Sequence, residues 1–118
     1  MSDYIIAPMY QSLSINKIIS SIKDEISKRN SINSISGVIY KITNVSDDNI
    51  VFKTKSRNNG KAEIISFENI KIVLEILKKI KNFNTSNPIL KMKIPNKIHK
   101  KRSPLFAILL ATNVIIRI

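Results

Sequence analysis

The sequence predicts an α+β fold: an N-terminal helix, a three-stranded antiparallel β-meander, then C-terminal helices and a short final strand. Three observations indicate it. Isoleucines recur at helical spacing in two segments, β-branched runs in the middle are separated by Asn, Asp and Gly, and a Ser-Pro pair near the C-terminus is typical of a helix start. Because the chain has 118 residues, of which 43% are hydrophobic, we expect one domain, residues 1–118, around one core.

The first part of the chain is expected to hold one long helix. Residues 1–12 are predicted to form an extended lead-in. Ser14 can then cap a helix that ends near Arg29, and residues 30–36 are expected to form a polar linker. The apolar stripe of this helix consists of Ile15, Ile18, Ile19, Ile22 and Ile26.

Residues 37–65 are predicted to form the meander. Its strands are expected at residues 37–45, 50–55 and 61–65, where β-branched and alternating apolar positions occur. A Ser-Asp-Asp-Asn cluster separates the first two strands. The second and third strands are separated by Asn58-Asn59-Gly60. We expect a type I′ hairpin turn there, because Asn-Gly tolerates positive φ angles.

Residues 66–113 are predicted to form a helical, basic half. Ser66 can cap a helix that runs to about residue 81. Pro88 and Pro95 interrupt the following segment, so any helix in it, such as one at 87–93, must be short. Ser103, as a hydroxyl cap, and Pro104, as the first helical residue, then predict a helix over 104–111, before a last strand at 114–118.

The chain carries a net charge of +12, from 20 Lys and Arg against 8 Asp and Glu. Such a charge repels itself, and a polyanion offsets this repulsion. Nucleic acid is the commonest partner of this kind, ahead of an anionic membrane surface. With no cysteine and one histidine, we expect no disulfide, no metal and no cofactor. The N-terminus does not resemble a secretory signal, and the longest apolar stretch is too short to span a bilayer, so we expect a cytoplasmic protein.

The basic residues are concentrated in the later part of the chain. Residues 76–118 contain ten Lys and Arg and no acid, and six of these cations fall within residues 91–102. This run directly precedes the predicted helix start at Pro104, where backbone N–H groups favour anions. A solvated basic loop is the alternative interpretation. The predicted phosphate-binding residues of this segment are Lys91, Lys93, Lys97, His99, Lys100, Lys101, Arg102 and Ser103.

A second basic cluster surrounds the predicted hairpin and consists of Lys53, Lys55, Arg57 and Lys61. Lys53 and Lys55 are two positions apart on the predicted strand, so they are expected on one face, roughly 7 Å apart, close to the spacing of successive phosphates. An edge strand protected by lysines is the alternative. The two clusters make one interface only if the fold places them on the same side.

The tract from Ser66 onward contains a capped helix with VLEIL, a proline-broken middle and the sequence KKRSPLFAILLATNVI. It resembles small helix-turn-helix or winged-helix-like DNA-binding modules, such as those of bacterial restriction–modification systems. The resemblance implies a helix-turn-helix-like arrangement of the C-terminal helices, with the β-hairpin as the wing. Because LFAILLA is almost wholly apolar, base contacts would then come from residues 97–103 or from the hairpin.

These observations predict a non-enzymatic nucleic-acid-binding protein, with DNA favoured over RNA as the partner. RNA binding is the nearest alternative. An interaction protein that uses residues 114–118 as an edge strand, for instance in a homodimer, is another, and a peripheral membrane role is less favoured.

Catalysis has little support in the sequence. Lys61 and Glu63 show the spacing of a metallonuclease site in reversed order, without a second acid nearby. A metal-free ribonuclease would need His99 as its base, with Lys100, Arg102 or Tyr40.

Overall fold

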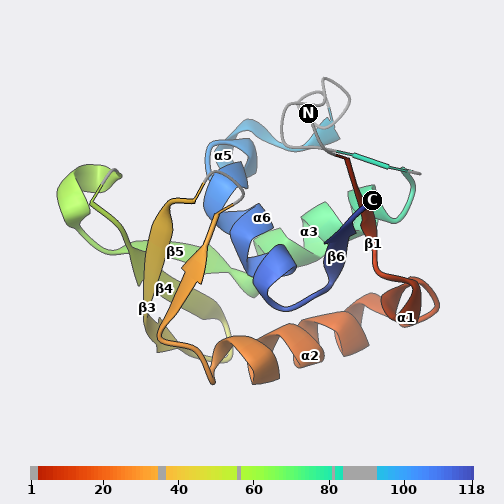
Figure 1. Cartoon of the computed structure of the whole chain (residues 1–118), viewed down its shortest axis with the longest axis horizontal. Coiled ribbons are helices and arrows are strands. Elements are labelled where there is room, and N and C mark those ends of the chain that lie inside the picture. The colour runs from red at the N-terminus through yellow and green to blue at the C-terminus, as the bar shows by residue number, and fades with distance from the viewer. Residues whose placement is uncertain (1–2, 35–36, 56, 81, 84–92) are drawn as a thin grey trace.

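The computed structural model describes residues 3–34, 37–55, 57–80, 82–83 and 93–118 (Figure 1). The chain is α+β, as predicted. In the described ranges it has five α-helices, a four-stranded antiparallel sheet of order β2-β3-β4-β5 and a two-stranded antiparallel sheet of order β1-β6. The main helices pack on one face of the larger sheet, and its other face is open.

The N-terminal segment is only partly the extended lead-in that we expected. β1 (Tyr4–Ile6) is extended, but α1 (Pro8–Gln11) follows it at once, with a proline at its start. β1 pairs with β6 (Ile115–Arg117), and the two strands lie side by side (Figure 1). The final strand predicted at 114–118 therefore exists, but it belongs to the small sheet and not to the meander.

The two long amphipathic helices confirm the sequence prediction. α2 (Ile15–Ile26) begins after Ser14, whose hydroxyl accepts a hydrogen bond from the Lys17 N–H at 3.3 Å. α3 (Phe67–Leu77) begins after Ser66, whose hydroxyl accepts from the Asn69 N–H at 3.1 Å. In α2 the stripe residues Ile18, Ile22 and Ile26 are buried, and the other two are half-buried. α3 also buries one apolar face, and it ends four residues before the predicted limit at 81.

The meander is present as β3 (Ile39–Val45), β4 (Asn49–Lys53) and β5 (Glu63–Ser66), but a fourth strand extends it. β2 (Ser31–Asn33) pairs with β3 inside the segment that we expected to be a polar linker. Its one apolar side chain, Ile32, is 4% exposed and anchors the strand in the core. This single buried position is too short a pattern to predict a strand.

The connection from β4 to β5 corrects the predicted type I′ hairpin. The last paired positions are Phe52 and Glu63, so residues 54–55 and 57–62 belong to a wide loop that projects beyond the sheet (Figure 1). Positive φ angles do occur there, at Asn58, Asn59 and Gly60, but within the short 3-10 helix η1 (Asn58–Gly60). As a consequence Lys55 lies beyond the end of β4, and Lys53 and Lys55 do not share a strand face.

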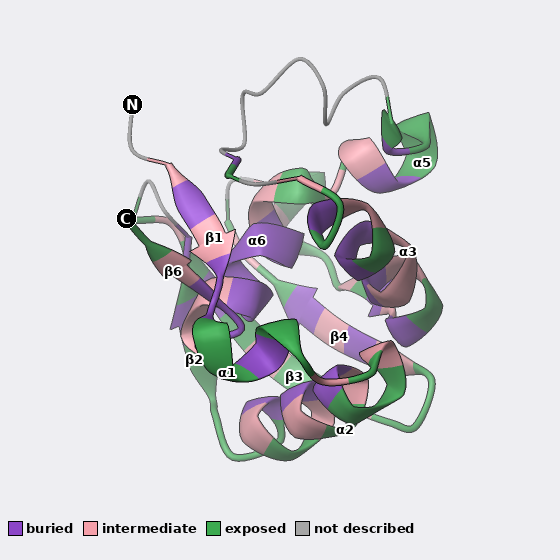
Figure 2. Cartoon of the chain, turned by 90° about the vertical axis from the view of Figure 1, so that its right-hand side faces the viewer, coloured by how far each residue is buried: buried purple, intermediate pink, exposed green. Residues whose placement is uncertain are grey.

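The C-terminal helices are α5 (Asn96–His99) and α6 (Arg102–Ala111). Ser103 is not the N-cap that we predicted: Lys101 occupies that position, and no side chain caps the helix. α6 lies at the centre of the molecule, with residues 104–109 all buried (Figure 2). The short helix suggested at 87–93 falls, except for Lys93, outside the described residues.

Candidate nucleic-acid interface

The open face of the larger sheet carries a pair of exposed lysines. Residues on this face alternate with the buried Tyr40, Ile50 and Phe52, whose side chains point to the helices. Lys41 and Lys53 are direct cross-strand partners, and both are exposed. Like charges directly opposite one another on paired strands destabilise a sheet, and a bound anion would relieve this repulsion. Lys41 was not among the predicted binding residues.

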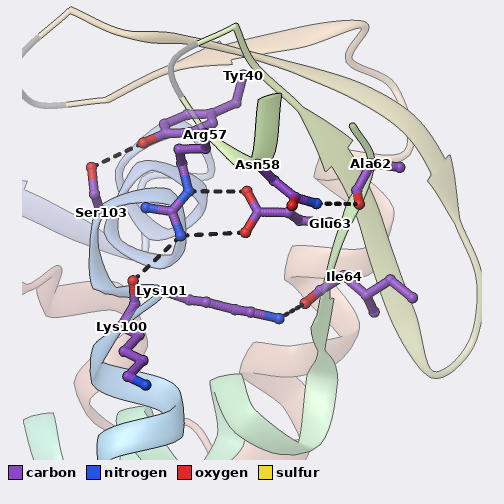
Figure 3. Close-up of polar contacts among 9 residues, drawn as sticks. All are labelled: Tyr40, Arg57, Asn58, Ala62, Glu63, Ile64, Lys100, Lys101 and Ser103. Carbon is purple, nitrogen blue, oxygen red and sulfur yellow. Dashed lines mark hydrogen bonds and ion pairs between the residues drawn. The ribbon is translucent and has the colours of Figure 1, made fainter. Parts of the chain in front are cut away.

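Arg57, from the β4–β5 loop, forms a clasp between this loop and the start of the C-terminal helices. Its Nε donates to Oε2 of Glu63 at 3.0 Å, and its Nη2 donates to Oε1 of Glu63 at 3.4 Å (Figure 3). The same Nη2 also donates to the backbone carbonyl of Lys100 at 3.3 Å. The Arg57 and Glu63 side chains are only 27% and 15% exposed, so solvent screens this pair less than a surface salt bridge.

Two further contacts fix the α5–α6 junction to the sheet (Figure 3). The Lys101 ammonium group donates to the backbone carbonyl of Ile64 on β5. The Ser103 hydroxyl is hydrogen-bonded to the Tyr40 hydroxyl at 3.0 Å, from the start of α6 to β3. The β4–β5 loop, which carries Lys55, Arg57 and Lys61, and the α5–α6 junction, which carries residues 100–103, are therefore adjacent in the fold.

These contacts divide the predicted site residues into two groups. Arg57, Lys101 and Ser103 bind other parts of the chain, so they position the surface. His99 is half-buried, and its backbone carbonyl accepts a hydrogen bond from Arg102. Lys91 lies outside the described residues. The exposed cations of the two clusters are Lys53, Lys55, Lys61, Lys93, Lys97, Lys100 and Arg102.

Acidic side chains neutralise little of this charge. Within the described part of the chain, the ion pairs join Arg57 to Glu63 and Lys28 to Asp24 and Glu25. The Lys28 pairs lie at the C-terminal end of α2, and the described lysines of the sheet face and of α5 pair with no described carboxylate. The positive charge of these surfaces thus remains exposed to solvent.

The aromatic side chains do not contribute to this surface. The three tyrosines and four phenylalanines of the chain are all buried. Residues 105–109 of α6, the apolar segment of the helix-turn-helix-like pattern, are buried as well. Contact with a nucleic acid would therefore depend on the cations and on the backbone around them.

The residues considered for catalysis have other partners. Glu63 is engaged by Arg57, and the Tyr40 hydroxyl is bonded to Ser103 inside the fold. The described residues contain no cluster of three His, Asp or Glu side chains that could hold a metal ion. None of the helices in the described ranges is long and apolar enough to cross a membrane.

Comparisons of the chain with protein-family models, with curated proteins and with solved structures find no match. Lys41 and the Arg57–Glu63 pair are the features of this candidate interface that the sequence prediction missed. Pairing β3 with β4 around the turn at residues 46–49 would have placed Lys41 near Lys53. The exact partner could not be predicted, because the strand register shifts between Ile42 and Asn44.

Proposed function

We propose that this chain is a non-enzymatic nucleic-acid-binding protein whose lysines contact phosphates. The observation that carries this proposal is the clasp between Arg57 and the Lys100 carbonyl, because it holds together two basic clusters that are far apart in the sequence. The exposed cations around the clasp have no described carboxylate partner, and phosphate is the anion that a duplex presents in a regular array.

The burial of the aromatic residues supports phosphate contacts as the main source of affinity. Single-strand-binding surfaces usually gain affinity by stacking bases on exposed aromatic rings, and this chain has none exposed. DNA is our first candidate because of the resemblance of about residues 37–113 to small DNA-binding modules. Structured RNA is the alternative, and direct competition between the two ligands distinguishes them.

The test is fluorescence anisotropy with a labelled DNA duplex, titrated at several salt concentrations. If about six phosphates are neutralised, the logarithm of the association constant should fall with the logarithm of the salt concentration with a slope of about −5. The double variant Lys97→Ala with Lys100→Ala should reduce the slope by about 2, since two phosphate contacts are lost.

A matched control is Lys17→Ala with Lys79→Ala, which removes the same charge from exposed positions on α2 and just beyond α3. The control should bind as the unmodified protein does, apart from a small effect of net charge. Absence of binding to duplex and single-stranded DNA and to RNA at low salt would refute the proposal. Equal weakening by both double variants would refute the assigned interface.

A further inference from the structure

A groove opens on the exposed side of the larger sheet, where β3 begins, β4 ends and the wide loop returns. Its volume is about 580 Å³, within the range of about 300–1,000 Å³ that is typical of small-molecule sites. The residues that line it are Gly37, Ile39, Lys41, Lys53, Thr54, Lys55 and Gly60.

The walls of the groove combine positive charge with an apolar patch. Lys41, Lys53 and Lys55 are all exposed, and no acidic residue is among the described residues that line the groove. Ile39 is 62% exposed and gives the groove an aliphatic surface. Three ammonium groups beside an aliphatic surface suit a compact ligand that carries both an anionic group and a flat apolar part.

The only two glycines of the chain both line this groove. Gly37 and Gly60 have φ angles of +91° and +78°, which other residues adopt only with strain. The Gly37 N–H donates to the Ser34 carbonyl at 3.0 Å, and the Gly60 N–H donates to the Arg57 carbonyl at 2.9 Å. Without side chains at these two positions, a ligand can approach the backbone of both turns closely.

We infer that this groove binds a nucleoside phosphate. The phosphate would lie among Lys41, Lys53 and Lys55, and its charge would offset the repulsion within the cross-strand lysine pair. The nucleoside would lie against Ile39. A free nucleotide and an unpaired nucleotide of a bound strand present the same chemistry to the groove. The choice of a nucleotide over other organic anions rests on the proposed function.

The two glycines also provide a direct probe. Selective ¹⁵N-glycine labelling of the full chain gives a two-peak NMR spectrum in which both signals come from the groove. Titration with a nucleoside monophosphate should shift both peaks and saturate in the millimolar range or below. Inorganic phosphate at the same ionic strength should shift them less, because it lacks the part that contacts Ile39.

The variant Lys41→Ala with Lys53→Ala should weaken the nucleotide response about tenfold or more, since two charge-assisted contacts are lost. Lys17→Ala with Lys79→Ala removes equal charge elsewhere and should leave the response unchanged. Peaks that stay in place throughout the titration, or that respond equally to inorganic phosphate, would overturn the inference. So would equal loss in both double variants.

Short single strands and blunt-ended duplexes, added in separate titrations, distinguish the two sources of the ligand. A response to single strands stronger than that to the mononucleotide supports the unpaired nucleotide of a strand, and the reverse supports a free nucleotide. If duplex DNA binds in the anisotropy assay while neither glycine peak responds to any nucleotide, the groove inference fails and the proposed function stands. If the peaks respond to a mononucleotide while no polynucleotide binds, the proposed function fails alone.

Discussion

Replacement of Arg57 by methionine tests whether the clasp holds the two basic clusters together. Methionine keeps an unbranched apolar side chain but removes the guanidinium group, so the Glu63 carboxylate, 15% exposed, loses its partner. Removing one partner of a fully buried ion pair costs about 3–5 kcal/mol, whereas exposed pairs contribute about 0–1 kcal/mol. Because Arg57 itself is 27% exposed, we expect an intermediate loss, about 2 kcal/mol.

Urea unfolding followed by circular dichroism measures this loss, which should lower the midpoint without changing the slope m. In a thermal scan a domain of this size should lose roughly 8 °C in Tm. Lys28→Met is the matched control, because it breaks a pair at the end of α2 whose side chains are 62% and 72% exposed, and it should change stability by less than about 0.5 kcal/mol. Adding Glu63→Gln to Arg57→Met should recover part of the loss, since no unpaired charge then remains.

The clasp also has a consequence for binding. A residue that only contacts a phosphate should, when removed, lower the salt slope by about 0.9 and leave stability unchanged. If Arg57 positions the loop, its removal should weaken duplex binding and destabilise the fold together. An Arg57→Met variant as stable as Lys28→Met would refute the positioning role.

Three further predictions concern the fold. Ser66→Ala should destabilise the protein by about 1 kcal/mol, because the Asn69 N–H at the start of α3 loses its acceptor, and an unchanged urea midpoint would contradict this. Tyr40→Phe removes the hydrogen bond to Ser103 and should cost about 1 kcal/mol; a double-mutant cycle with Ser103→Ala should give a non-zero coupling energy, whereas strict additivity would mean that the bond contributes nothing. Ile22→Ala should lower the free energy of unfolding by about 2–5 kcal/mol, because the Ile22 side chain is 0% exposed. A thermal scan with little change in Tm would show that the buried stripe does not hold α2 in place.

Helices α2 and α3 were predictable because their signals are local. A serine cap followed by isoleucines at helical spacing specifies both the start of a helix and the face it buries. These caps and stripes were confirmed at Ser14 and Ser66. The meander was predictable for the same reason, since alternation along β4 marks its buried face at Ile50 and Phe52.

The errors arose where a distant part of the chain determines a local conformation. Asn59 and Gly60 have the positive φ angles that these residues favour. They lie in a wide loop and not in the expected tight turn, and Arg57 of this loop bonds to Glu63 and to the distant Lys100 carbonyl. Ser103 has the residue type of a cap, yet its hydroxyl bonds to Tyr40, 63 positions away in the chain. The polar segment around Ile32 forms a strand because Ile32 is buried in the core and the backbone beside it pairs with the edge of β3.

The sequence by itself determined the net charge, the segments in which cations gather and the two amphipathic helices, because composition and periodicity are properties of neighbouring residues. Only the tertiary structure decided which cations face solvent and which, such as Arg57 and Lys101, are used to join elements. It also placed Lys41 opposite Lys53 and brought both glycines to one groove. The physical reason is that strand register and side-chain pairing depend on residues that meet only when the chain folds.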